Sequence, residues 1–253
     1  FSCLYGKTLN VGRVQTPTLK MLVDRDAAIM NFKKEKYYHV RLMLPGAEAA
    51  SAKICAADEA GKLKAACEAS AAVCTSLTRE NKTAIPPKLF DLTSLQREAN
   101  RIYGYTAKQT FDLAQTLYEK KLLTYPRTDS NYITDDMAPK LEGLVKKVRF
   151  FDEASADELI LTGLNIDTRV VNNAKVSDHH AILPTEYIDK AEKIELTKEE
   201  KAILDMVIRR FLAVLSQEYQ YNETAVIFDV NGETFRCKYK VPVKLGWKRF
   251  YPG

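Results

Sequence analysis

The sequence predicts a multi-domain α+β protein in which a mainly helical domain is inserted into a small, largely antiparallel β domain. Strand-like patterns occur near residues 37–80 and again after residue 222, and strong helix starts lie between them. Pro86 and Pro87 follow the first strand region and indicate a domain boundary there. Because the two strand regions are separated in sequence, we expect one sheet with two connections to the helical domain, an arrangement that can act as a hinge.

The N-terminal segment 11–30 is predicted to be a loop followed by a helix. Thr16 is placed to cap this helix, Pro17 suits its first position, and apolar residues follow at helical spacing: Leu19, Leu22 and Val23. The chain begins FSCLYG without an initiator methionine and runs directly into this pattern. We therefore expect that upstream sequence is absent from the chain.

The first β region is predicted from alternation in YYHVRLML, residues 37–44. One face carries Tyr38, Val40, Leu42 and Leu44, the period of a half-buried strand. An alanine-rich helix is expected over 58–71, and VCTSLTRE then returns to strand-like residues.

Two consecutive helices open the predicted helical domain, each with a capping box: Thr93 with Gln96, and Thr106 with Gln109. Gly104 supplies the turn between them. Each helix has one apolar face, formed by Leu92, Leu95, Ala99 and Ile102 in the first and by Phe111, Ala114 and Leu117 in the second. The pair resembles a helix-turn-helix unit, although many such hairpins bind nothing.

Two further helices and a hairpin complete the prediction. Thr134 begins a helix with Leu141, Leu144, Val145 and Val148 on its apolar face. Thr197 and Glu200 form a third capping box, ahead of a buried face with Ile203, Leu204, Val207, Ile208, Phe211 and Leu215. A turn at Asn231 and Gly232 joins two strands, and the second strand points Phe235, Cys237, Tyr239 and Val241 inward.

Composition limits the possible classes of function. The chain has 253 residues, of which 46% are hydrophobic, and no stretch approaches the roughly 18 to 20 consecutive apolar residues of a membrane span. Its five cysteines are scattered without a CxxC pair, which predicts neither a zinc site nor a disulfide framework and favours a reducing cytoplasm. A net charge of +5 is compatible with a nucleic-acid partner but does not establish one.

The segment YPRTDS carries the strongest chemical signal. Pro126 pushes Tyr125 out of the helical region, so the side chains of Tyr125 and Arg127 are expected to point the same way from an extended loop. A tyrosine phenol is almost fully protonated at neutral pH and needs a cation to act as a nucleophile. A guanidinium supplies one and also holds a phosphate in place. The pair suits phosphodiester transesterification, although the bare motif by itself is weak and a loop tyrosine packed on its neighbours explains it more simply.

Three segments together resemble the type IA DNA topoisomerases, in the form of the topoisomerase III branch. LLTYPRTDSNYIT is similar to the active-site segment of this family, GRVQTPTLKMLVDRD to the stretch ahead of its hinge domain, and SDHHAILPT to the histidine segment after the nucleophile. They occur in the family's order and cover most of the chain. The resemblance implies a strand-binding helical segment in 1–30, a β hinge domain in 31–85 and 222–253, and a helical gate domain in 86–221.

The resemblance also implies roles for individual residues. Tyr125 would form a phosphotyrosyl bond to the 5′ end of the cut strand, Arg127 would orient the scissile phosphate, and His179 would bind near the cleavage site. DNA contacts are implied for His180 and for the strand-binding residues Arg13, Gln15 and Thr16. Read without the family, the histidines are an ordinary surface or core pair, and the N-terminal residues are a helix cap beside a solvated arginine.

The neighbours of the tyrosine are expected to shape its loop. Thr128, Asp129 and Ser130 provide local hydrogen bonds, and Asp129 can also pair with Arg127 when DNA is absent.

Magnesium and DNA are the further implied partners. The family binds Mg²⁺ with acidic residues of an N-terminal Toprim domain, for which we find no matching cluster, so no metal site is expected in this chain. Single-stranded DNA is the implied substrate of a monomer in the bacterial nucleoid, and cleavage by this chain alone is not expected to be efficient. The rival readings are a non-catalytic helix-turn-helix module and, less favoured, a recombinase or relaxase.

Overall fold

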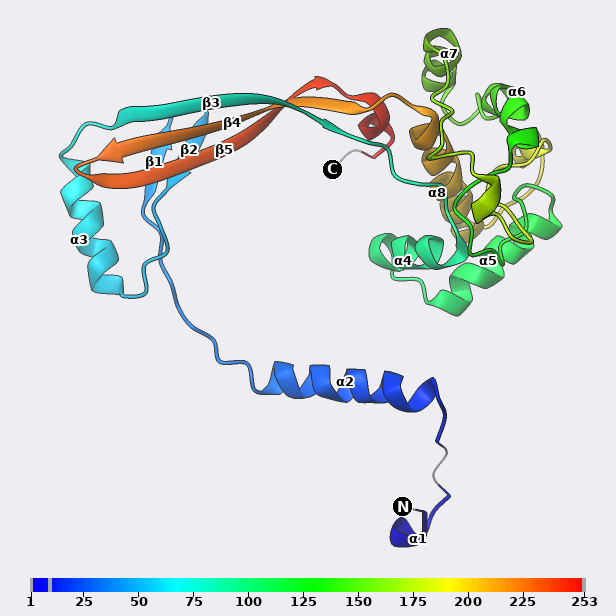
Figure 1. Cartoon of the computed structure of the whole chain (residues 1–253), viewed down its shortest axis with the longest axis horizontal. Helices are drawn as coiled ribbons and strands as arrows, with labels where there is room; N and C mark the ends of the chain where they lie inside the picture. The colour runs from blue at the N-terminus through cyan, green and yellow to red at the C-terminus, as the bar shows by residue number, and fades with distance from the viewer. Residues whose placement is uncertain (1, 9–10, 252–253) are drawn as a thin grey trace. The chain divides into compact units, whose positions relative to one another are not determined.

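The computed structural model describes residues 2–8 and 11–251, and it confirms the α+β class (Figure 1). The chain forms two compact units. The first comprises residues 1–76 and 226–237, and the second comprises residues 77–225 and 238–253. The two units divide within the long strands, each of which contributes residues to both units.

A five-stranded sheet has the order β1-β2-β5-β4-β3. Its strands are β1 (Arg41–Leu44), β2 (Ala47–Ala50), β3 (Val73–Ala84), β4 (Tyr219–Val230) and β5 (Glu233–Lys244). β1 pairs antiparallel with β2, and Ala50 of β2 pairs with Arg236 of β5. Asn231 and Gly232 both have positive φ, the conformation that a two-residue hairpin turn requires, so the predicted β4–β5 hairpin is confirmed.

The first unit has a small core on this sheet, formed by Ala49, Val226, Val230, Phe235 and Cys237. β1 is shorter than predicted, because Tyr38 forms only an isolated bridge with Ile54. The predicted inner face of β5 is confirmed only in its first half: Phe235 and Cys237 are buried, whereas Tyr239 and Val241 lie beyond the first unit and are exposed. Helix α3 (Ala57–Glu68) follows β2.

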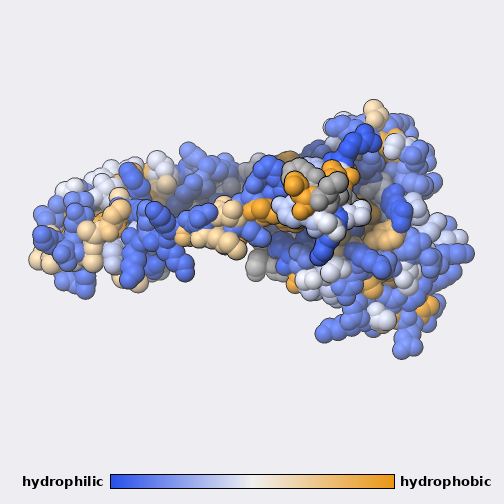
Figure 2. Space-filling model, turned by 90° about the horizontal axis from the view of Figure 1, so that it is seen from below, coloured by the Kyte–Doolittle hydropathy of each residue, from blue (hydrophilic) through white to orange (hydrophobic). Residues whose placement is uncertain are grey.

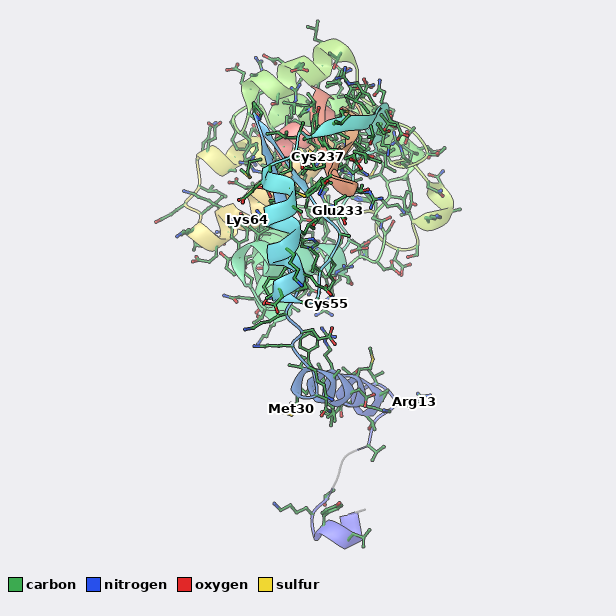
Figure 3. All side chains as sticks on the ribbon, turned by 90° about the vertical axis from the view of Figure 1, so that its left-hand side faces the viewer. Arg13, Met30, Cys55, Lys64, Glu233 and Cys237 are labelled. Atoms are coloured by element: carbon green, nitrogen blue, oxygen red, sulfur yellow. The ribbon has the colours of Figure 1, made fainter. Side chains whose placement is uncertain are left out.

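Helix α2 (Gln15–Met30) has no buried residue, and the short helix α1 (Ser2–Tyr5) precedes it. Arg13 lies just ahead of α2 and Met30 at its far end (Figure 3). The prediction that Thr16 caps α2 is wrong, because the helix begins at Gln15, two residues before the predicted first position, Pro17. The Thr16 hydroxyl instead accepts a hydrogen bond from the Gly12 N–H at 3.1 Å, so it still satisfies a backbone donor near the helix start.

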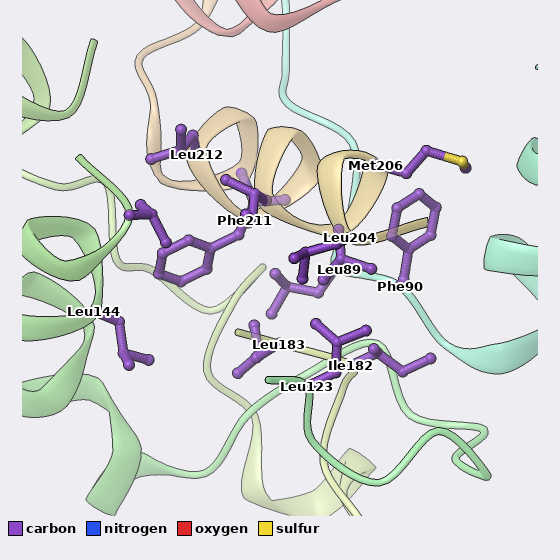
Figure 4. Close-up of a cluster of buried hydrophobic side chains, with 14 of the residues drawn as sticks. Leu89, Phe90, Leu123, Leu144, Ile182, Leu183, Leu204, Met206, Phe211 and Leu212 are labelled. Atoms are coloured by element: carbon purple, nitrogen blue, oxygen red, sulfur yellow. The ribbon is translucent and has the colours of Figure 1, made fainter. Parts of the chain in front are cut away.

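The second unit contains most of the helices. They are α4 (Leu92–Tyr103), α5 (Ala107–Glu119), η1 (Asp135–Lys140), α6 (Leu141–Lys147), α7 (Glu153–Thr162), η2 (Asn173–Lys175), η3 (Ile188–Glu192), α8 (Lys198–Leu215) and η4 (Gly246–Phe250). α8 packs against α5 and η4. Its side chains, including Phe211, face Leu123, Ile182 and Leu183 in one buried cluster (Figure 4). This core fixes the segments that carry the candidate site.

Two of the three predicted capping boxes form. The boxes of Thr106 with Gln109 and of Thr197 with Glu200 are confirmed. The predicted Thr93 box is wrong: Asp91 caps α4, and its carboxylate accepts from the Ser94 N–H at 2.6 Å. Asp and Ser are also strong capping residues, and the competing Asp91 lies two residues earlier.

The surface is mostly hydrophilic on the face drawn in Figure 2, with hydrophobic side chains scattered among polar ones. Ile102, expected on the apolar face of α4, is exposed. No helix among residues 2–8 and 11–251 is long and apolar enough to cross a membrane.

Candidate active site

Tyr125 lies in a non-helical segment between α5 and η1 whose backbone is fixed to residues 181–184. The Thr124 N–H donates to the Leu183 carbonyl and the Leu183 N–H donates to the Thr124 hydroxyl, both at 2.9 Å. The preceding residue, Leu123, forms a β-bridge with Pro184. The position of the tyrosine is therefore set by a segment almost sixty residues later in the sequence.

Buried hydroxyls hold the loop after Tyr125, as predicted. Thr128 donates to the His179 carbonyl at 2.9 Å and accepts from the Ser130 N–H at 3.1 Å. Ser130 in turn donates to the Lys175 carbonyl at 2.8 Å. Asp129 is exposed, and no ion pair with Arg127 forms within the described residues, so that predicted contact is wrong.

The ring of Tyr125 lies between two other aromatic rings. Its centroid is 4.6 Å from that of His179, at an interplanar angle of 54°, and 5.3 Å from that of Tyr118 in an edge-on arrangement. Tyr125 is half-buried and lines a cleft of about 760 Å³. The structure thus brings together Tyr125 and His179, two predicted site residues from separate segments of the sequence.

Arg127 is exposed and lines a second depression, of about 380 Å³, together with His179. Its guanidinium lies 4.7 Å above the ring of Phe111. The expectation that Tyr125 and Arg127 point the same way is wrong, because they line different depressions. The Thr128 N–H donates to the Pro126 carbonyl at 3.0 Å, and this three-residue turn centred on Arg127 replaces the extended backbone on which the expectation rested.

His179 and His180 have different surroundings. His179 is exposed, contacts the Tyr125 ring and lines the same depression as Arg127, so it adjoins both of the other predicted catalytic residues. His180 is half-buried, and its Nδ1 lies 2.8 Å from the Ala181 carbonyl oxygen. The pKa of the Asp136 carboxyl lies below its usual range, chiefly because of a hydrogen bond from Thr134, and the positive charge of Lys140 contributes. His180 lines neither depression.

A third group beside the loop was not predicted from the sequence. The hydroxyl of buried Tyr132 lies 2.7 Å from the Lys88 ammonium and 3.4 Å from that of Lys175. The hydrogen bond from Lys88, more than that from Lys175, places the pKa of the Tyr132 phenol below its usual range. These lysines lie 44 and 43 residues from Tyr132, so no local pattern in the sequence could have indicated them.

The predicted N-terminal contacts Arg13, Gln15 and Thr16 lie at the start of α2 in the first unit, whereas Tyr125 lies in the second. Gln15 is the first helical residue, and all three side chains are exposed. Within residues 2–8 and 11–251, no three His, Cys, Asp or Glu side chains converge to hold a metal ion.

Comparison with known proteins matches residues 2–253 to a family model described as DNA topoisomerase. The chain is 37% identical over 256 aligned positions to DNA topoisomerase 3 of Bacillus licheniformis, and 36% identical to that of Bacillus subtilis. Each alignment covers 98% of this chain and 35% of the relative, so the chain spans about a third of their length. Full-length topoisomerase I from Thermotoga maritima shares the fold, with a TM-score of 0.75 and 24% identity over 98% of this chain and 41% of that one.

Proposed function

Because the chain belongs to the type IA DNA topoisomerase family, on the topoisomerase III branch, we propose that it carries the nucleophile of a DNA strand-passage enzyme. The observation that supports this most directly is the position of Tyr125 at a cleft, with its ring against His179. A tyrosine that served only to fill the core would be buried there; Tyr125 is half-buried.

The reaction is an exchange of phosphodiesters. The Tyr125 hydroxyl oxygen attacks a backbone phosphorus, a tyrosine–phosphorus bond forms, and the bond from phosphorus to the 3′ oxygen breaks. The phenolic proton is lost and the departing 3′ oxygen gains one. Religation reverses each step. Because one phosphate ester replaces another, no ATP is consumed.

The surrounding residues bind the scissile phosphate and the rest of the DNA strand. Arg127, whose guanidinium is exposed, holds the phosphate through paired hydrogen bonds, and His179 stabilises its charge from the side next to the tyrosine ring. Arg13, Gln15, Thr16 and His180 contact the DNA backbone further along the strand. Residues 86–221 act as the gate, residues 31–85 and 222–253 as its hinge, and residues 1–30 as the strand-binding segment.

The whole protein needs more than this chain. We propose that it uses Mg²⁺ bound by a Toprim domain outside this chain, acts on single-stranded DNA as a monomer, and works at the bacterial nucleoid in the cytoplasm. The metal would offset negative charge near the scissile phosphate. The alternative is a helix-turn-helix module formed by α4 and α5 that binds DNA without cutting it.

The test joins this chain to a Toprim domain and presents a single-stranded oligonucleotide labelled at its 3′ end, with Mg²⁺. Wild type is expected to retain the label after denaturation, as a covalent adduct, and Tyr125→Phe to lose it. Tyr103→Phe is the matched control, because it removes a hydroxyl from an exposed tyrosine that lines neither depression, and it should form the adduct. An equal yield from Tyr125→Phe would refute the nucleophile. DNA binding by wild type without any adduct would favour the helix-turn-helix alternative.

A further inference from the structure

The cleft beside Tyr125 has walls suited to nucleobases. It lies entirely within the second unit and is formed by the end of α5, by η1 and α6, and by residues 184–187. Tyr118 and Tyr187 line it, and each is 40% exposed, so both rings are accessible to a ligand. Apolar side chains complete the lining: Leu123, Met137, Leu144 and Pro184. Its volume of about 760 Å³ is typical of sites that enclose an organic ligand.

The charge of the cleft suits a polyanion. Three lysines line it, Lys121, Lys140 and Lys147, against a single carboxylate, that of Glu186. Lys147 donates to the Glu186 backbone carbonyl, so that contact leaves its positive charge uncompensated. Within the described residues, neither Lys121 nor Lys140 forms an ion pair.

The backbone at Lys121 also has an unusual conformation. Its φ is +62°, a left-handed conformation in which glycine is the usual residue after a helix. The Thr185 hydroxyl donates to the Lys121 carbonyl, which ties this residue to the opposite wall of the cleft. Lys121 therefore adds a positive charge to the lining of the cleft, at a backbone position where glycine would add none.

We propose that this cleft holds the first nucleotides of the DNA strand that becomes attached to Tyr125 through its 5′ phosphate. The proposal rests on the proposed function of Tyr125. Bases stack on Tyr118 and Tyr187, and Lys121, Lys140 and Lys147 bind the phosphates between them. The cleft and Tyr125 belong to the same compact unit, so the attached strand remains with the tyrosine when that unit moves. The cleft is thus a binding site for the DNA on the 5′-phosphate side of the cut.

The test uses the 253-residue chain at low salt, where phosphate contacts are strongest. The probe is a short single-stranded oligothymidylate with a 5′ phosphate and a photoreactive 5-iodouracil as its first base. Irradiation followed by peptide mass spectrometry is expected to find the cross-link on Tyr118 or Tyr187. A second probe, with iodouracil as its last base and no 5′ phosphate, is expected to leave both tyrosines unmodified. Neither measurement requires cleavage, so the result is independent of whether Tyr125 is the nucleophile.

Affinity for the first probe provides a second readout. Tyr118→Leu and Lys140→Ala are each expected to weaken binding about tenfold, the order of one lost stacking or phosphate contact. The matched controls are Tyr103→Leu and Lys198→Ala, because Tyr103 is 43% exposed and both residues lie outside the cleft. Thermal melting of each variant identifies any loss of folding, and the exposed Lys140 keeps the test valid if Tyr118→Leu unfolds. Equal affinity in wild type and Lys140→Ala, or cross-links to the cleft from the second probe, would overturn the proposal.

Discussion

The imidazole of His179 lies against the ring of Tyr125, with 4.6 Å between their centroids, and the Thr128 hydroxyl holds the His179 backbone at 2.9 Å. The histidine is therefore held beside the tyrosine by a part-buried hydrogen bond from the loop that follows Tyr125. A side chain in this position can donate to a phosphate as its charge develops.

His179→Ala is expected to reduce the rate of DNA cleavage about a hundredfold while leaving the fold intact, because it removes a preorganised donor from an exposed position. Adduct formation over time, measured in the Toprim-joined protein, checks this. His180→Ala is the control: its ring lines neither depression, and a much smaller effect is expected. If the His180 variant lost as much activity as the His179 variant, the distinction between the two histidines would be wrong.

Arg127→Lys is expected to restore little of the activity that Arg127→Ala loses. The guanidinium forms paired hydrogen bonds with a phosphate and stacks on Phe111, whereas an ammonium offers a point charge. We expect cleavage to fall about a hundredfold in the alanine variant. Arg209→Ala provides the comparison, because the Arg209 guanidinium lies over Phe151 at a similar distance, 4.9 Å, but lines neither depression. Full activity in Arg127→Lys would show that charge alone suffices.

Local signals in the sequence predicted local features of the structure. The Thr197 cap and the turn at Asn231 and Gly232 depend on neighbouring residues only, and both are confirmed. The turn at Arg127 could not be predicted, because it belongs to a loop held by a hydrogen bond from Thr128 to a residue 51 positions away. The cluster around Tyr132 and the lysines of the cleft were missed for the same reason: tertiary packing assembles them. Tyr125 and His179 were selected from the sequence, but the contact of Tyr125 with Tyr118 was found only in the fold.

Stability is expected to depend on pH through Glu200. This buried carboxylate lies 2.7 Å from the Lys120 ammonium and accepts from the Thr197 N–H at 2.8 Å. Burial alone would raise the pKa of Glu200, but the bonds from Lys120 and Thr197 outweigh it and place the pKa below the ordinary 4.5. A lowered folded-state pKa stabilises the fold fully above the unfolded value, and this stabilisation is lost as pH falls through the folded pKa.

Glu200→Gln is therefore expected to lower the free energy of unfolding by about 1–3 kcal/mol at neutral pH, with the difference from wild type narrowing below pH 4.5. Urea denaturation across this pH range measures it. Glu199→Gln changes a neighbouring carboxylate in the same first turn, for which only a few tenths of a kcal/mol are expected. If the difference in unfolding free energy between wild type and Glu200→Gln stayed constant down to the most acid pH, the negative charge of Glu200 would not be its cause.

Tyr132 provides the last prediction, because its phenol lies between Lys88 and Lys175. The lowered pKa of Tyr132 means that one tyrosine of the folded chain should ionise below the ordinary value of 10 when phenolate absorbance is followed during a pH titration. Tyr132→Phe should abolish this early component, and Lys88→Met should move it to higher pH because Lys88 is its largest cause. Tyr103→Phe, which alters an exposed ring, should leave this early component unchanged.

The lowered pKa of Tyr132 also makes the stability of the fold depend on pH. The contact of the phenolate with the lysines stabilises the fold fully above pH 10, and this stabilisation is lost as pH falls through the folded pKa. Tyr132→Phe should therefore lower the free energy of unfolding more in alkali than at neutral pH. An early component that survives in Tyr132→Phe would assign the shifted phenol to another tyrosine.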